Sequence, residues 1–255
     1  MRKAWVLAAI AAAAAIVAMP SAAQCARQSP PHAVALLELY TSEGCSSCPS
    51  ADRWLSGIQR TDSVVPLALH VDYWDRLGWK DRFASARFSG RQNALARQAG
   101  SRAVYTPGVF LDLREFRGWG SARFDDAVRA INARSARADI RLELDPPSSA
   151  QLAVKADFRL KPGGPGLAQA FVALYENRLS NEVKAGENRG VVLHHDFVVR
   201  EWIGPIEVAG RAELRRTLAL ETDWKTGDLG VAAFVQDPAA REVMQATALP
   251  LCTKG

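Results

Sequence analysis

The sequence predicts an α/β domain followed by an all-β domain. In the first part, short apolar runs such as residues 64–71 alternate with segments whose apolar residues recur at helical spacing, such as residues 121–137. From residue 140 onward, apolar and polar residues alternate, and turn-forming stretches separate the runs. About seven such runs are typical of a β-sandwich. We therefore expect two domains, residues 24–138 and 139–255.

The composition indicates a globular protein that works outside the cytoplasm. The chain has 255 residues, of which 48% are apolar and 23% charged. Residues 1–23 carry Arg2 and Lys3, then an apolar run, then small residues that favour cleavage after Ala23. The apolar run is short for a membrane span, so we expect a periplasmic or secreted protein with no span after signal cleavage. Without the signal the net charge is only slightly positive, which argues against nucleic-acid binding.

The stretch at residues 36–49 carries the chemistry. An apolar run is followed by Gly44, Cys45 and, three positions later, Cys48 and Pro49. The pattern predicts a strand, a turn and the start of a helix, where the helix dipole lowers a thiol pKa. Cys45 is the candidate nucleophile, and Cys48 is placed to attack a mixed disulfide on Cys45.

Two other interpretations of this pair remain open. A C-x-x-C pair can be a static disulfide, or half of a zinc site. Zinc requires about four ligands, and the sequence has no second C-x-x-C or His pair at ligand spacing. His194 and His195 are adjacent in an expected strand and point to opposite faces. We therefore favour a redox-active pair and predict no metal or cofactor site.

The order of elements up to residue 138 is strand, helix, strand, helix, strand, strand, helix, which resembles the thioredoxin-like fold. Cys45 and Cys48 follow the first strand, and Thr106 and Pro107 precede the third. The resemblance implies that Pro107 is cis and lies beside the cysteines, with Thr106 offering its backbone to a bound substrate chain. X-Pro bonds are the usual site of cis peptides. The fold class expected is thus an α/β thioredoxin-like domain followed by an all-β sandwich.

Three strings resemble a family of secreted bacterial proteins classed as domain of unknown function 1223. They read YTSEGCSSCP at residues 40–49, HVDYWD at residues 70–75 and YTP at residues 105–107. The resemblance implies a thioredoxin-like domain but no substrate. Thioredoxins carry a buried Asp where this chain has Leu39. The neighbouring Glu38 is a candidate proton acceptor if buried near the thiols, the alternative being a solvated or ion-paired side chain.

Two further features are a second pair of cysteines and a glycine-rich stretch. Cys25 and Cys252 are left over in an oxidising compartment, so we expect them to form a second disulfide between the two ends of the mature chain. The glycine-rich stretch at residues 161–166 predicts a hairpin loop, because no Gly-Lys-Ser/Thr follows that would bind phosphate.

These observations predict an exported thiol–disulfide oxidoreductase. Its partners are expected to be the thiols and disulfides of secreted or periplasmic proteins, together with a redox partner protein. The alternative is a non-catalytic binding or scaffold protein in which Cys45–Cys48 is a fixed disulfide. The two hypotheses differ in the reactivity of Cys45.

Overall fold

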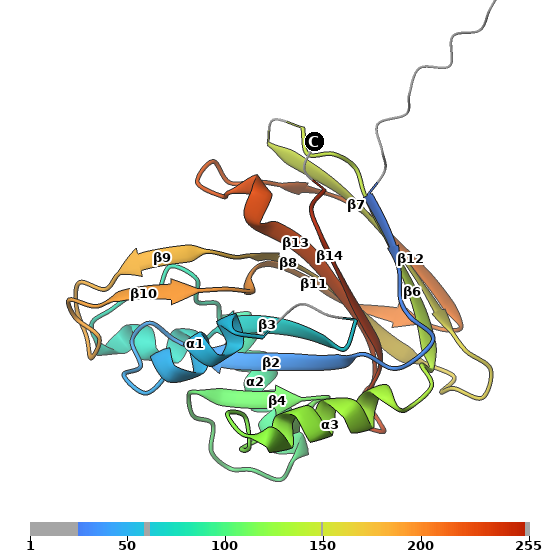
Figure 1. Ribbon diagram of the computed structural model, residues 1–255, viewed down its shortest axis with the longest axis horizontal. Helices are drawn as coiled ribbons and strands as arrows, with labels where there is room; N and C mark the ends of the chain where they lie inside the picture. Colours follow the sequence, from blue (N-terminus) through green and yellow to red (C-terminus); the bar gives the residue numbers. More distant parts are fainter. Residues whose placement is uncertain (1–24, 59–61, 149, 253–255) are drawn as a thin grey trace, which may run out of the picture.

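The computed structural model describes residues 25–58, 62–148 and 150–252 (Figure 1). The expected signal peptide at residues 1–23 lies outside the described residues. Within the described part of the chain, no helix has the length and apolar character needed to cross a membrane.

The centre of the molecule is a mixed sheet of eight strands. Along the sheet the strands follow the order β14-β13-β8-β11-β3-β2-β4-β5. Parallel pairing joins β2 to β3, and their Val- and Leu-rich sequences suit strands that are covered on both faces. The strands are β2 (Ala35–Thr41), β3 (Val64–His70), β4 (Gly108–Leu111), β5 (Arg114–Glu115), β8 (Ala168–Glu176), β11 (Val198–Val208), β13 (Leu229–Asp237) and β14 (Glu242–Pro250).

The expected fold class, an α/β thioredoxin-like domain followed by an all-β sandwich, is wrong. Among the described residues, strands make up 44% and helices 18%, and the large sheet takes strands from both sides of residue 138. β11 pairs in parallel with β3 at Val198 and Ala68, and the main chain of Ala68 donates to the carbonyl oxygen of Phe197 at 2.8 Å. Main-chain hydrogen bonds therefore connect the two parts within one sheet.

A second sheet packs on one face of the large one. It contains β1 (Cys25–Gln28), β6 (Ala138–Leu144), β7 (Gln151–Leu160) and β12 (Arg211–Ala219), in the order β1-β6-β7-β12. Side chains of β8 alternate between two cores: Val172 and Leu174 face the four-stranded sheet, whereas Phe171 and Tyr175 face the other core. The stretch at residues 161–166 joins β7 to β8 in different sheets, so the predicted hairpin loop is wrong.

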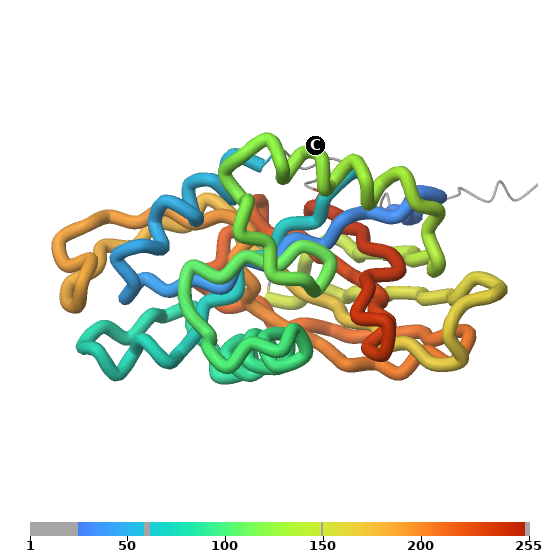
Figure 2. The backbone as a smooth tube through the Cα atoms, turned by 90° about the horizontal axis from the view of Figure 1, so that it is seen from below, coloured from blue at the N-terminus to red at the C-terminus, as the bar shows by residue number. Residues whose placement is uncertain are grey.

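In the described part of the chain, three α-helices pack around the large sheet, and a hairpin extends from it (Figures 1 and 2). Phe88 and Leu95 of α2 and Phe124 and Val128 of α3 belong to the same core as Phe171. The hairpin of β9 and β10 reaches beyond the sheet and lies beside α1 in both views. The bounds are α1 (Pro49–Ser56), α2 (Ala86–Gln98), α3 (Ala122–Asn132), β9 (Leu179–Glu182), β10 (Val192–His195), and the 3-10 helices η1 (Asp72–Leu77) and η2 (Thr226–Asp228).

A disulfide joins Cys25, the first residue of β1, to Cys252, which follows β14, with their Cα atoms 5.8 Å apart. This is the pairing that the sequence predicts. It connects an edge strand of the small sheet to an edge strand of the large sheet. The N- and C-terminal ends of the described chain are therefore fixed to each other.

Candidate functional site

The Cys45–Cys48 disulfide closes the turn between β2 and α1. The Cα atoms of the two cysteines are 5.4 Å apart. Cys48 is the N-cap of α1 and Pro49 its first residue, which suits proline because that N–H has no helical partner. Cys48 therefore precedes the helix, and Cys45 lies in the turn before it. Both cysteines are 0% exposed, whereas Ser46 and Ser47 between them are exposed.

Thr106 and Pro107 lie next to this turn, and the bond between them is cis. The Ser47 hydroxyl is 3.3 Å from Cys45 Sγ and donates to the Thr106 carbonyl oxygen at 3.4 Å. The indole of Trp74 in η1 donates to Thr106 Oγ1 at 2.7 Å. The structure thus brings together the cysteine pair, the Thr106–Pro107 dipeptide and the aromatic cluster that follows β3.

The loop between β9 and β10 contacts the cysteine turn from the other part of the chain. The side-chain amide of Asn188 donates to the carbonyl oxygens of Glu43 and Cys45, both at 2.9 Å. The Glu187 carboxylate accepts the main-chain N–H of Ser46 at 2.9 Å, and this bond lowers the Glu187 pKa. The cysteine turn is held on one side by residues that the sequence analysis does not single out.

Beneath the cysteine turn lies a set of buried ionisable side chains, here called the buried ionisable cluster. Each is at most 6% exposed. His70 Nδ1 is 2.7 Å from Asp81 Oδ2, and the His70 and His195 rings meet edge to face with centroids 4.9 Å apart. Five segments supply its members, which are Glu43, Asp52, His70, Asp81 and His195.

His195 lies between two carboxylates of this cluster. Its Nε2 is 3.4 Å from Glu43 Oε1, and its Nδ1 is 3.7 Å from Asp52 Oδ2. Neither His195 nitrogen, nor Asp52 Oδ2, has a hydrogen-bond partner among the described residues. Glu43 is anchored separately, because its carboxylate accepts from Trp79 Nε1 at 2.9 Å and from the Asn181 amide. Buried polar atoms without partners are costly, so this arrangement suggests a role beyond stability.

The cluster has a defined charge pattern. Burial disfavours a charged His70, but the Asp81 carboxylate outweighs it and raises the His70 pKa. Burial likewise opposes ionisation of Asp81, yet His70 and main-chain donors lower its pKa. Burial raises the pKa of Asp52, and His195 and His70 oppose that rise only in part. His70 and Asp81 therefore form an ion pair, while the raised pKa lets Asp52 take up a proton more readily than an ordinary carboxyl.

Glu38, the candidate proton acceptor from the sequence, is engaged elsewhere. It is 0% exposed, and its carboxylate is paired with Arg91 of α2, with Nη2 and Oε2 3.2 Å apart. Tyr40 donates a hydrogen bond to the same carboxylate at 3.3 Å. The Arg91 guanidinium lies about 5 Å from three aromatic ring centroids, those of Phe171, Trp202 and Phe234. Glu38 is therefore an ion-paired side chain, the alternative to a proton acceptor.

The two adjacent histidines point to opposite faces of β10, as strand alternation predicts. His194 is exposed and His195 is 2% exposed. Within the described residues, no group of three or more His, Cys, Asp or Glu side chains is arranged to hold a metal ion. Sequence reasoning missed the cluster, although Asp52 stands four positions after Cys48, a spacing that shares a helix face.

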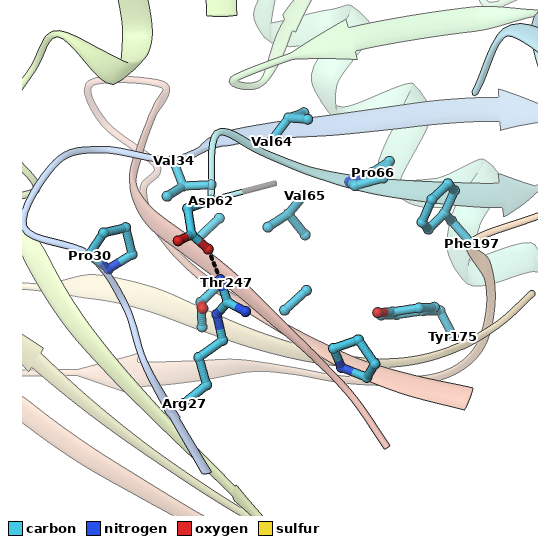
Figure 3. Close-up of a pocket in the computed structure, with 13 residues that line it drawn as sticks. Arg27, Pro30, Val34, Asp62, Val64, Val65, Pro66, Tyr175, Phe197 and Thr247 are labelled. Atoms are coloured by element: carbon cyan, nitrogen blue, oxygen red, sulfur yellow. Dashed lines mark ion pairs between the residues drawn. The ribbon is translucent and has the colours of Figure 1, made fainter. Parts of the chain in front are cut away.

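A separate cavity of about 140 Å³ lies at the opposite end of β3 (Figure 3). Val64, Val65 and Pro66 from the first half of the strand line it, and Arg27 and Asp62 form an ion pair within it. His70 ends the same strand on the side of the cysteine turn. The cavity is therefore distinct from the site around Cys45 and Cys48.

Comparisons with known proteins place the chain in a family. It is similar to the crystal structure of protein AGR_C_4864 from Agrobacterium tumefaciens, with 28% identity, a TM-score of 0.63, and coverage of 85% of this chain and 94% of that one. HBP35 of Porphyromonas gingivalis shares the fold at 15% identity and a TM-score of 0.64, with coverage of 86% and 76%. No curated protein matches the chain. The model of the family "Protein of unknown function (DUF1223)" matches residues 36–236, and the chain therefore belongs to this family.

Proposed function

We propose that this protein is a thiol–disulfide oxidoreductase that acts on protein disulfides outside the cytoplasm. The observation that carries the proposal is the Cys45–Cys48 disulfide, closed across the N-terminus of α1. Unpaired main-chain N–H groups at a helix N-terminus stabilise a thiolate, which is the nucleophile in disulfide exchange.

The surroundings of the two sulfurs support different roles for them. Cys45 Sγ lies 3.3 Å from the hydroxyl of the exposed Ser47, which can rotate its O–H from the Thr106 carbonyl oxygen to a Cys45 thiolate. Cys48 is the N-cap of α1 and stands four residues before Asp52 of the buried ionisable cluster. We assign attack on the client disulfide to Cys45 and resolution of the mixed disulfide to Cys48. Thr106 and Pro107 border the same turn and are assigned to hold the client chain.

The extracytoplasmic location rests on two features. The chain contains two disulfides, Cys25–Cys252 and Cys45–Cys48, and disulfides persist mainly in oxidising compartments. Residues 1–23 have the composition of a secretory signal. We infer a periplasmic or secreted protein whose partners are protein thiols and disulfides and a redox partner protein.

One observation favours a different function, that of a binding or scaffold protein with a static disulfide. Both cysteines are 0% exposed in the closed form, so a client thiol reaches neither without movement of the surrounding turn. The loop at residues 186–190 and Trp74 border that turn. The two functions differ in whether Cys45 reacts.

Trapping of mixed disulfides tests the proposal. In the Cys48→Ser variant Cys45 attacks client disulfides but cannot be released, so mixed disulfides with extracytoplasmic proteins should accumulate on non-reducing gels. Replacing Cys45 by Ser should abolish them, and this variant is the matched control. Absence of trapped clients, with a Cys45 thiol that titrates near the ordinary pKa of about 8.5, would falsify the oxidoreductase assignment and support the scaffold protein.

A further inference from the structure

We propose that Asp52 accepts the proton of the Cys48 thiol when Cys48 resolves the mixed disulfide, and that His195 positions the Asp52 carboxylate for this step. The inference rests on the oxidoreductase function proposed above and adds the proton pathway to it. The juxtaposition that carries it is a buried carboxyl one helical turn below Cys48, facing a buried histidine with no hydrogen-bond partner among the described residues.

The helix fixes the relationship between Asp52 and Cys48. The main-chain N–H of Asp52 donates to the Cys48 carbonyl oxygen at 3.0 Å, which is the hydrogen bond between residues four positions apart. Side chains at this spacing lie on one helix face. Cys48 is 0% exposed and Asp52 6% exposed, so both side chains lie on the inward face of α1. Water has little access to either group, and a proton leaving Cys48 needs a protein acceptor.

The contacts of Asp52 leave it able to act as that acceptor. Its Oδ2 atom is buried without a hydrogen-bond partner among the described residues. Its ion-pair partner in the cluster is His195, whose Nδ1 is 3.7 Å from Oδ2. On its other side His195 faces Glu43 at 3.4 Å, and Trp79 and Asn181 hold Glu43 in place. His195 is therefore fixed between two carboxylates and directs a ring nitrogen toward Asp52.

The other ionisable groups around Asp52 are already engaged. His70 and Asp81 are paired with each other at 2.7 Å. The electrostatic influences on Asp52 come from His195, His70 and Asp81, and the Thr41 hydroxyl also interacts with it. Burial raises the Asp52 pKa from its ordinary value, in the direction of the pH at which a general base works best.

The resolving step balances as follows. Before it, Cys45 is joined to one sulfur of the client, and Cys48 is a thiol. The Cys48 proton moves to Asp52, the Cys48 thiolate attacks Cys45 Sγ, the bond between Cys45 and the client sulfur breaks, and the client leaves as a thiolate. Two electrons have then passed from the cysteine pair to the client disulfide. A dithiol of the redox partner protein returns the pair to its reduced form.

A two-phase experiment separates this inference from the proposed function. The full chain is prepared with Cys45 and Cys48 reduced and the Cys25–Cys252 disulfide intact, as checked by peptide mapping, and is mixed with 5,5′-dithiobis(2-nitrobenzoate). Attack by Cys45 releases one coloured thiolate, and resolution by Cys48 releases the second. Stopped-flow absorbance resolves the two phases across pH 5 to 9.

In Asp52→Asn the second phase should slow by about 100-fold near neutral pH, the usual contribution of a general base, and should recover as alkaline pH ionises Cys48 directly. The first phase should be unchanged. Asp52→Glu should restore part of the second phase, and His195→Gln should shift its pH profile. Asp125→Asn, an exposed carboxyl in α3, is the matched control and should change neither phase.

The outcomes are distinguishable. A second phase with an unaltered rate and pH profile in both Asp52→Asn and His195→Gln overturns the inference and leaves the proposed function standing. The absence of a first phase in the unmodified protein overturns the proposed function itself. Because Asp52→Asn removes a buried ionisable group, circular dichroism of each variant verifies the fold before the kinetics.

Discussion

The side chain of Asn188 donates a hydrogen bond to the main-chain oxygen of Cys45, 2.9 Å away and 143 residues earlier in the chain. The same amide reaches Glu43 with its second N–H, so both of its donors serve the cysteine turn. Asn188 is 6% exposed, which keeps these bonds away from water. The conformation of the turn around Cys45 therefore depends on a loop that belongs to the second part of the sequence.

Replacing Asn188 by Ala should loosen this turn. Two buried carbonyl oxygens lose their donors, which costs about 1–3 kcal/mol of unfolding free energy. The freed turn should also let a small dithiol reduce Cys45–Cys48 faster. Urea unfolding measures the first effect and the rate of reduction by dithiothreitol the second. Arg189→Ala in the same loop is exposed and serves as the control. An unchanged reduction rate in Asn188→Ala would show that the loop does not control access.

The His70–Asp81 pair should give stability a characteristic pH dependence. The raised His70 pKa contributes stability that is complete below its ordinary value of 6.5 and disappears as pH rises through the raised value. The lowered Asp81 pKa contributes stability that is complete above its ordinary value of 3.8 and disappears as pH falls through the lowered value. The pair therefore stabilises the protein most between these two ordinary values.

Asp81→Asn tests this window. Removing one member of a buried pair typically costs about 3–5 kcal/mol. Urea unfolding of the variant and the unmodified protein should differ most between about pH 4 and 6.5, and the difference should shrink at alkaline pH, where His70 loses its proton. A constant difference at every pH would mean that the pair is not ionised in the folded protein.

Glu38→Gln should destabilise the protein without altering disulfide exchange. The change leaves the Arg91 guanidinium, 12% exposed, without its carboxylate, and such uncompensated charges cost about 3–5 kcal/mol. Glu115→Gln is the matched control, because its partner Arg117 is exposed and such pairs contribute about 0–1 kcal/mol. Unfolding by urea gives the stability. A lost resolving phase with unchanged stability would instead support Glu38 as the proton acceptor.

Loss of the Cys25–Cys252 disulfide should reduce stability while leaving the other pair reactive. The disulfide closes a loop with a sequence separation of 227. Chain-entropy arguments assign the closure of such a loop about 5 kcal/mol of unfolding free energy. The double variant Cys25→Ser, Cys252→Ser should unfold at lower urea concentration, yet alkylation of reduced Cys45 should proceed at the original rate. A change in Cys45 reactivity would contradict the independence of the two disulfides.

Local features of the fold could be predicted from sequence because they depend on neighbouring residues. The apolar run at residues 64–71 corresponds to β3, and Pro49 does begin α1. The partners of each strand could not be predicted. Alternation shows which face a side chain occupies but not which strand lies alongside. Hence the pairing of Val198 with Ala68, which joins the two parts into one sheet, could not be predicted from the sequence around either residue.

Part of the candidate site could likewise be predicted from the sequence, and part could not. Cys45 and Cys48 are separated by only two residues and could be recognised as a motif. The buried ionisable cluster gathers from five separate segments, and each member has an ordinary local context. His195 stands in a His-His pair whose alternation suggested only a strand, and its place between Glu43 and Asp52 follows from the docking of β10 on α1.

The sequence separation between Asn188 and Cys45 also has a consequence for how the chain folds as it is delivered. A chain that is delivered N-terminus first exposes Cys25, Cys45 and Cys48 early. Asn188, which restrains the cysteine turn, and Cys252, the disulfide partner of Cys25, follow much later. During that interval any two of these three thiols can form a disulfide. Any early pair of Cys25 with Cys45 or Cys48 has to be exchanged before the Cys25–Cys252 and Cys45–Cys48 disulfides of the folded protein can form.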